Sequence, residues 1–125
     1  MDPSSLRFAS THEWVYLSGD TATVGISKFA VDELSDVVHV ELPSVGKKVA
    51  AGEVFGEIES VKAVSDLYAP VSGEIVEVNT PLEDDQSELS EDPFGAGWII
   101  KLKVSNSSEV ESLMNYEAYQ KLCEH

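Results

Sequence analysis

The sequence of 125 residues contains a single cysteine, Cys123, close to its end. One thiol cannot form an internal disulfide, a CxxC redox pair or a cysteine zinc site, so we expect the protein to work in a reducing compartment. Residues 1–7 have neither the apolar stretch of a secretory signal nor the arginine-rich pattern of a transit peptide. The expected location is therefore the bacterial cytoplasm, or the mitochondrial matrix if a transit peptide has been removed.

Basic residues are also scarce, since 8 lysines and arginines face 23 aspartates and glutamates, for a formal net charge of −15. Such a charge repels a phosphate backbone, which argues against nucleic acid, and it favours a monomer that meets partner proteins with basic faces. The apolar runs are too short to span a bilayer. With 42% hydrophobic residues, the chain is expected to form one domain over residues 1–125, with a β core at about 8–104.

Apolar residues that recur at every second position predict a mainly β protein. Residues 15–17 and 22–26 alternate in this way on either side of Ser18-Gly19-Asp20, which predicts a hairpin. Residues 38–42 continue the pattern, and residues 98–104 predict the strand that lines the core.

Two segments have helical spacing instead. Ser27 is placed to cap a short helix at 28–34, and Ser108 with Glu111 has the spacing of a capping box that would open a C-terminal helix at 108–122. The acidic segment 83–92 lacks the ligand spacing and central glycine of an EF-hand, so we expect a solvated loop there.

The centre of the sequence contains two similar phrases, residues 42–49 and 69–76, each with a proline, two residues, a glycine and an alternating run. Between them, residues 52–59 and 64–68 resemble two strands that converge on Ser60-Val61-Lys62-Ala63. This arrangement predicts a lysine at the tip of a hairpin, where an enzyme could reach and acylate its amine. A solvated turn lysine is the ordinary alternative.

The local motif favours the attachment site. Residues 56–74 resemble the lipoyl-attachment segment of the glycine cleavage system H protein, and the likeness extends through 11–15, 22–26, 40–43 and 97–101. Biotin carriers usually have methionines on both sides of the lysine, whereas this sequence has valine and alanine. The resemblance implies a mainly β, lipoyl/biotinyl-domain-like barrel-sandwich hybrid with a short internal helix and a C-terminal helix.

The resemblance also implies a function. Lipoic acid would be bound covalently as N6-lipoyl-lysine at Lys62, and the protein would be a non-catalytic carrier that lipoate-attaching enzymes modify. Its arm would accept an aminomethyl group from glycine decarboxylase (P protein), pass it to aminomethyltransferase (T protein) and be reoxidised by dihydrolipoamide dehydrogenase (L protein). Cofactors and partner enzymes then perform the chemistry.

In the family, a glutamate in an S-H-E-W segment and an aspartate just after the lysine are associated with a resting place for the loaded arm. These positions correspond to Glu13 and Asp66, and the family's serine is Thr11 here. Two other functions stay open at this point. One is an unmodified adaptor that kept the carrier fold, and the other is a carrier that hands lipoyl groups to other complexes.

Overall fold

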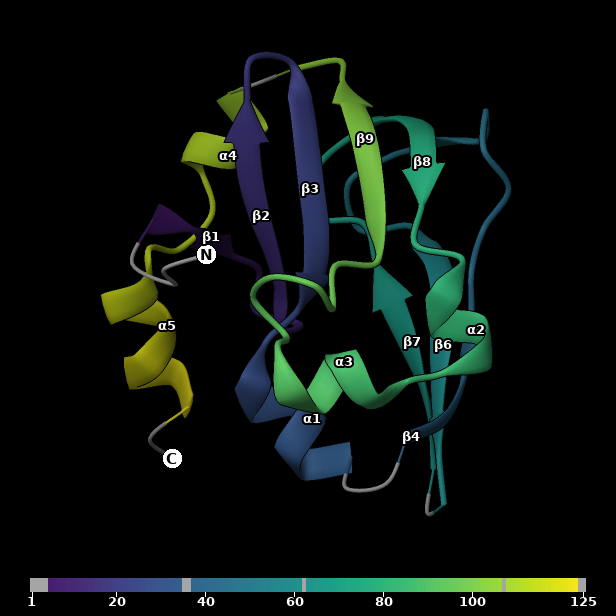
Figure 1. Ribbon diagram of the computed structural model, residues 1–125. Coiled ribbons are helices and arrows are strands. Elements are labelled where there is room, and N and C mark those ends of the chain that lie inside the picture. The colour runs from purple at the N-terminus through teal and green to yellow at the C-terminus, as the bar shows by residue number, and fades with distance from the viewer. Residues whose placement is uncertain (1–4, 35–36, 62, 107, 124–125) are drawn as a thin grey trace.

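Antiparallel strands make up most of the structure, a computed structural model that describes residues 5–34, 37–61, 63–106 and 108–123 (Figure 1). The strands are β1 (Arg7–Phe8), β2 (Glu13–Ser18), β3 (Thr21–Ile26), β4 (Val37–Glu41), β5 (Lys48–Val49), β6 (Val54–Ser60), β7 (Val64–Tyr68), β8 (Gly73–Val78) and β9 (Ile100–Val104). The helices are α1 (Lys28–Leu34), α2 (Pro81–Asp84), α3 (Ser87–Glu91), α4 (Ser108–Glu111) and α5 (Tyr116–Cys123). None of these helices is long and apolar enough to cross a membrane.

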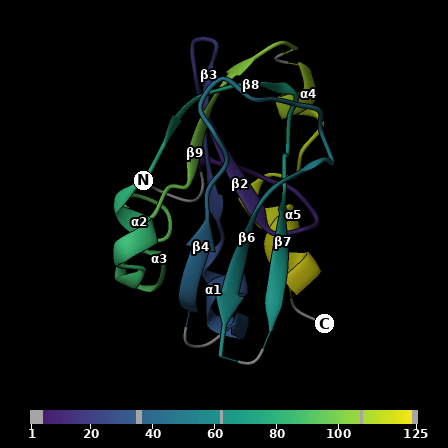
Figure 2. The ribbon, with the colours of Figure 1, turned by 90° about the vertical axis from the view of Figure 1, so that its right-hand side faces the viewer.

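Within the described ranges the strands form two sheets. One has six strands in the order β1-β2-β3-β9-β8-β5, and the other has three in the order β4-β6-β7. Figure 2 shows the smaller sheet extending below the larger one, with β6 and β7 reaching the lower end of the molecule. Side chains from both sheets, among them Val24, Val40, Ile58 and Leu102, share one buried cluster. The mainly β prediction is confirmed.

The predicted first hairpin is present as β2 and β3, in which Ser18 lies opposite Thr21. Gly19 in the connecting turn has φ 64°, a value that glycine adopts without the steric cost of a Cβ atom. Farther along the hairpin, Trp14 lies opposite Gly25, and a Cβ at position 25 would come within 2.5 Å of the indole ring. Glycine there makes room for the largest side chain of the core.

The predicted core strand is also confirmed. β9 pairs with β3 on one side and β8 on the other, and the side chains of Ile100 and Leu102 are fully buried. The two similar proline-glycine phrases lie side by side, because β5 from the first pairs with β8 from the second, with Val49 opposite Gly73.

The predicted internal helix forms as α1. The Ser27 side chain caps its first turn, since the Ser27 Oγ accepts a hydrogen bond of 3.2 Å from the Ala30 N–H. Ala30, Val31 and Leu34 turn toward the core.

The expected single helix at 108–122 is wrong, because the chain leaves helical geometry between α4 and α5. Met114 forms a two-way backbone bridge with Phe8, with N···O distances of 2.7 and 2.9 Å. These bonds extend the edge of β1, and they use the Met114 N–H and C=O that a continuous helix would need. Asn115 then starts α5 by accepting a 2.9 Å hydrogen bond from the Ala118 N–H.

This cap gives a first test of the C-terminal arrangement. Asn115→Ala removes the acceptor and is expected to lower the free energy of unfolding by about 1 kcal/mol. Asn115→Asp keeps an acceptor oxygen and should stay close to wild type. Urea unfolding of the three proteins measures the difference, and equal stability of the alanine variant would contradict the capping role.

The acidic segment 83–92 is mostly exposed, as expected, but it is helical and not a loop, since it contains the end of α2 and all of α3. Each of these short helices buries one leucine, Leu82 or Leu89. The carboxylate of Asp85 accepts a hydrogen bond from the Ser87 N–H between them. The charged side chains face water while the leucines anchor the segment.

Candidate functional site

The predicted attachment residue, Lys62, lies outside the described residues, but the hairpin on both sides of it is defined. The Ser60 N–H donates to the Ala63 carbonyl at 2.8 Å, and the Ala63 N–H donates to the Ser60 Oγ at 3.1 Å. Val61 is 68% exposed. The ends of β6 and β7 are therefore joined by hydrogen bonds on either side of Lys62, and Val61 beside them is open to solvent.

The carboxyl group of Glu13 is buried at the other end of β7. Glu13 is the first residue of β2, and only 1% of it is exposed. Its Oε1 accepts a hydrogen bond from the hydroxyl of Thr11, and its Oε2 accepts one from the Tyr68 N–H at 3.1 Å. Since β7 runs from the hairpin end to Tyr68, this strand connects the attachment segment with the buried carboxyl.

Burial raises the pKa of Glu13 to about 7, although the hydrogen bonds from Thr11 and Tyr68 oppose this effect. Near neutral pH the side chain is thus divided between its neutral and ionised forms. A carboxylate offers about four acceptor positions, and the Thr11 hydroxyl, the Tyr68 N–H and the backbone N–H of Glu13 itself donate to this one. The remaining acceptor capacity suits a cationic donor, and a cation would itself favour the ionised form.

Asp66 has a different setting. It lies on β7 opposite Glu57, which in turn lies opposite Glu41, so the three acidic side chains form a row across β4, β6 and β7. Asp66 is exposed, and none of the hydrogen bonds found among the described residues joins it to Glu13. The structure brings Thr11 and Glu13 together. Asp66 lies in the middle of β7, between the hairpin end and Tyr68.

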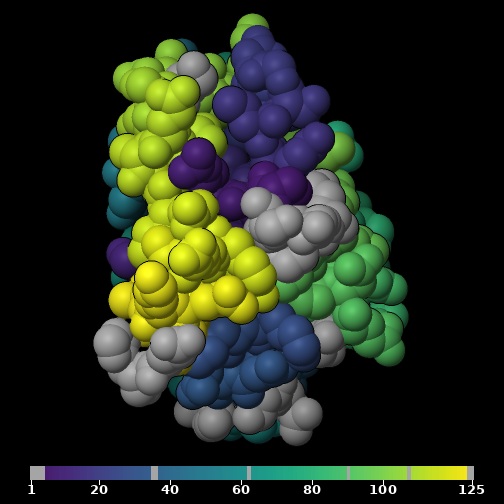
Figure 3. Space-filling view, turned by 90° about the vertical axis from the view of Figure 1, so that its left-hand side faces the viewer, coloured from purple at the N-terminus to yellow at the C-terminus, as the bar shows by residue number. Residues whose placement is uncertain are grey.

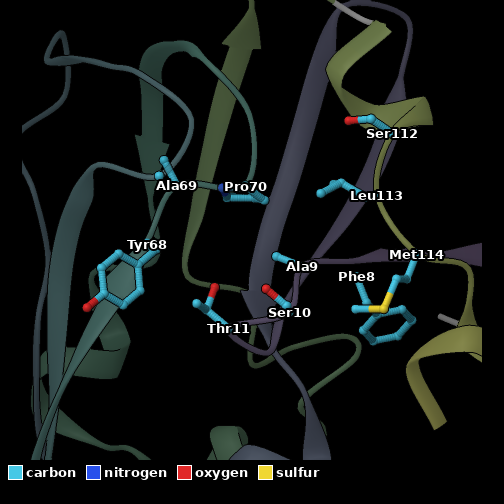
Figure 4. A pocket seen from close by; sticks show the side chains of 11 residues that line it. Phe8, Ala9, Ser10, Thr11, Tyr68, Ala69, Pro70, Ser112, Leu113 and Met114 are labelled. Carbon is cyan, nitrogen blue, oxygen red and sulfur yellow. The ribbon is translucent and has the colours of Figure 1, made fainter. Parts of the chain in front are cut away.

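A cavity of about 460 Å³ lies beside Thr11 and Tyr68, within the range of small-ligand sites (Figure 4). Its other walls come from the segment before β2, the segment after β7 and the connection between α4 and α5, and they are mostly apolar. The lining residues are Phe8, Ala9, Ser10, Thr11, Gly52, Tyr68, Ala69, Pro70, Ser112, Leu113 and Met114. Sequence reasoning missed the contribution of the C-terminal connection, because contacts between segments far apart in sequence bring it here, among them the Met114–Phe8 bridge and the hydrogen bond from Arg7 to the Leu113 carbonyl.

Known proteins are similar to this chain along nearly its whole length. The Glycine cleavage H-protein family matches residues 6–125. The glycine cleavage system H protein of Acinetobacter baumannii is 53% identical over 118 residues, covering 94% of this chain and 95% of the relative. That of Methylacidiphilum infernorum is 54% identical over 120 residues, covering 96% and 94%.

A crystal structure of a glycine cleavage system H protein from Mycobacterium marinum superimposes on this chain with a TM-score of 0.87. The two sequences are 42% identical, and the match covers 95% of this chain and 96% of the other. The expected lipoyl-domain-like barrel-sandwich fold is thereby confirmed. With these matches along nearly its whole length, the chain belongs to the glycine cleavage H-protein family.

Proposed function

We propose that this protein is the lipoylated carrier of the glycine cleavage system, with the lipoyl group bound to Lys62. The match to the family over residues 6–125 carries this proposal. When bound, a lipoyl group supplies a disulfide that takes up the aminomethyl fragment of glycine. The strands on either side of the lysine are joined by hydrogen bonds, the protein offers a place where the loaded arm can rest, and partner enzymes perform the catalysis.

The partners we propose are glycine decarboxylase, aminomethyltransferase, dihydrolipoamide dehydrogenase and a lipoate-attaching enzyme. The net charge of −15 supports docking to basic faces on these enzymes. A tethered arm also helps, because it keeps its end at an effective concentration on the order of millimolar near a docked active site.

The residues around Glu13 fit the loaded end of such an arm. A primary amine is protonated near neutral pH, and a buried carboxyl with remaining acceptor capacity is a suitable partner for an ammonium group. Thr11 and Tyr68 hold the carboxyl oxygens in place. The adjoining cavity, with Leu113 and Met114 in its wall, is suited to the apolar part of the arm.

Lipoylation is tested by intact mass spectrometry. The unmodified protein is incubated with a lipoate-attaching enzyme, lipoate and ATP, beside a lipoyl domain that is known to be modified. We expect the mass to rise by one lipoyl group. An unchanged mass, when the control domain is modified in the same mixture, would contradict the proposal and favour an unmodified adaptor.

The site formed by Thr11, Glu13 and Asp66, the shelter, is tested by how long the loaded arm keeps its amine. Replacing Glu13 with glutamine and Asp66 with asparagine together removes both carboxylates while the side-chain shapes stay. Loss of a charge-assisted hydrogen bond is expected to shorten the lifetime about tenfold or more. Ammonia release over time measures it, and a lifetime equal to that of the wild type would contradict the shelter.

A further inference from the structure

His12, which directly precedes Glu13, has φ 84°, a left-handed backbone conformation that costs free energy for a residue with a side chain. Two backbone hydrogen bonds of 2.9 Å hold the residue in place. Its N–H donates to the Ala9 carbonyl, and its own carbonyl accepts from the Ser27 N–H. The backbone turn at His12 determines how Thr11 and Glu13 are presented to each other.

The His12 side chain has a partner at the other end of the sequence. The Nδ1 atom lies 2.6 Å from the hydroxyl of Tyr119 on α5, and that hydroxyl lies 2.5 Å from the Ser27 Oγ. Burial lowers the pKa of His12, which favours the neutral ring, and a neutral ring can accept a hydrogen bond at Nδ1. Burial also raises the pKa of Tyr119, so its hydroxyl stays protonated and can donate a hydrogen bond.

The hydroxyl of Tyr119 is itself well fixed. Its ring stacks on Phe8, with centroids 4.5 Å apart and planes 9° from parallel. The imidazole ring also contacts Phe29 from α1, with ring centroids 5.4 Å apart. Figure 3 shows α5, in yellow, directly against α1, in blue, and Tyr119 on α5 is buried.

We propose that Tyr119 is a positioning residue that acts through His12 to hold Glu13 and Thr11 where they receive the amine of the loaded arm. This inference rests on the proposed function. Without the hydroxyl, the His12 side chain loses its hydrogen bond, and the two backbone hydrogen bonds hold the left-handed conformation less firmly. A rotation at the following residue would then draw the Glu13 carboxyl away from the Tyr68 N–H and toward water. α5 then stabilises the shelter through the hydrogen bond between Tyr119 and His12, the clasp, and none of its residues needs to contact the arm.

Tyr119→Phe tests the clasp, because it removes one oxygen and keeps the ring that stacks on Phe8. Tyr116→Phe, on the same helix, is the matched control. The first readout needs no lipoate: a carbon NMR titration of the Glu13 carboxyl in the unmodified full chain. We expect its midpoint to fall from about 7 toward the ordinary value of 4.5 in the Tyr119 variant and to stay unchanged in the Tyr116 variant.

The second readout is the lifetime of the loaded arm, with Glu13→Gln as the reference. We expect Tyr119→Phe to shorten it about three- to tenfold, in keeping with one lost hydrogen bond. If Glu13→Gln shortens the lifetime but Tyr119→Phe changes neither readout, the clasp is overturned and the shelter stands. If Glu13→Gln leaves the lifetime unchanged, the shelter itself fails, and the titration midpoint still decides whether Tyr119 positions Glu13.

Discussion

Lys62→Arg is expected to abolish both the lipoyl mass gain and glycine cleavage by the reconstituted system. Arginine keeps the positive charge and the length of the side chain, but its guanidinium group is always protonated and does not form the amide that lipoate requires. The hairpin hydrogen bonds between Ser60 and Ala63 use no atom of the Lys62 side chain, so the hairpin should stay intact. Turnover should therefore fall to the background of a mixture without carrier.

Lys48→Arg is the matched control, because Lys48 is an exposed strand residue on β5, outside the hairpin. It should be lipoylated and support turnover like the wild type. Mass spectrometry and release of labelled carbon dioxide from glycine measure the two effects. Normal turnover with Lys62→Arg would contradict the assignment of the arm to this residue.

The second large effect concerns the stability of the unmodified protein and its dependence on pH. Below about pH 4.5, Glu13 is neutral in both the folded and the unfolded chain. As the pH rises toward 7, the unfolded chain ionises while the folded chain keeps its proton, so the protein loses stability. A pKa raised from 4.5 to about 7 corresponds to about 3 kcal/mol.

Glu13→Gln isolates this effect, since glutamine resembles the neutral acid and does not titrate. Relative to this variant, the wild type is expected to lose about 2–3 kcal/mol of unfolding free energy between pH 5 and pH 8, by urea unfolding at each pH. Thr11→Val should widen the loss, because the Thr11 hydroxyl stabilises the ionised form. An equal difference at both pH values would show that Glu13 has no raised pKa.

The stability cost of Glu13 is consistent with a role in holding the loaded arm. A buried carboxyl that is half neutral at pH 7 interacts weakly with an uncharged arm, whereas an ammonium group nearby makes ionisation favourable. The empty and the loaded arm would therefore differ in how strongly they are held. Release of the amine at the next enzyme would return Glu13 to its mixed state.

Much of the fold could be predicted because local patterns determine it. The hairpin at Gly19, the cap at Ser27 and the alternation along β9 each depend on residues that are neighbours in sequence. The helix boundary at Met114 could not be predicted in this way. Its position depends on Phe8, whose backbone pairs with a residue more than a hundred positions away.

The site also depends on contacts between segments that are far apart in sequence. The family resemblance pointed to Thr11 and Glu13, and the structure places their side chains in contact. No pattern in the sequence links His12 with Tyr119, and nothing in the alternation of β7 indicates that the Tyr68 N–H donates to a carboxyl on β2. Both contacts arise only when distant segments pack together.

The central claim, that Lys62 anchors a lipoyl arm that carries the aminomethyl group, is tested most directly by peptide-level mass spectrometry. The lipoylated protein is analysed before and after incubation with glycine and glycine decarboxylase. We expect the lipoyl mass, and then the added mass of methylamine, both to lie on Lys62. Either mass on another residue, or an unmodified Lys62 in protein that supports glycine cleavage, would contradict it.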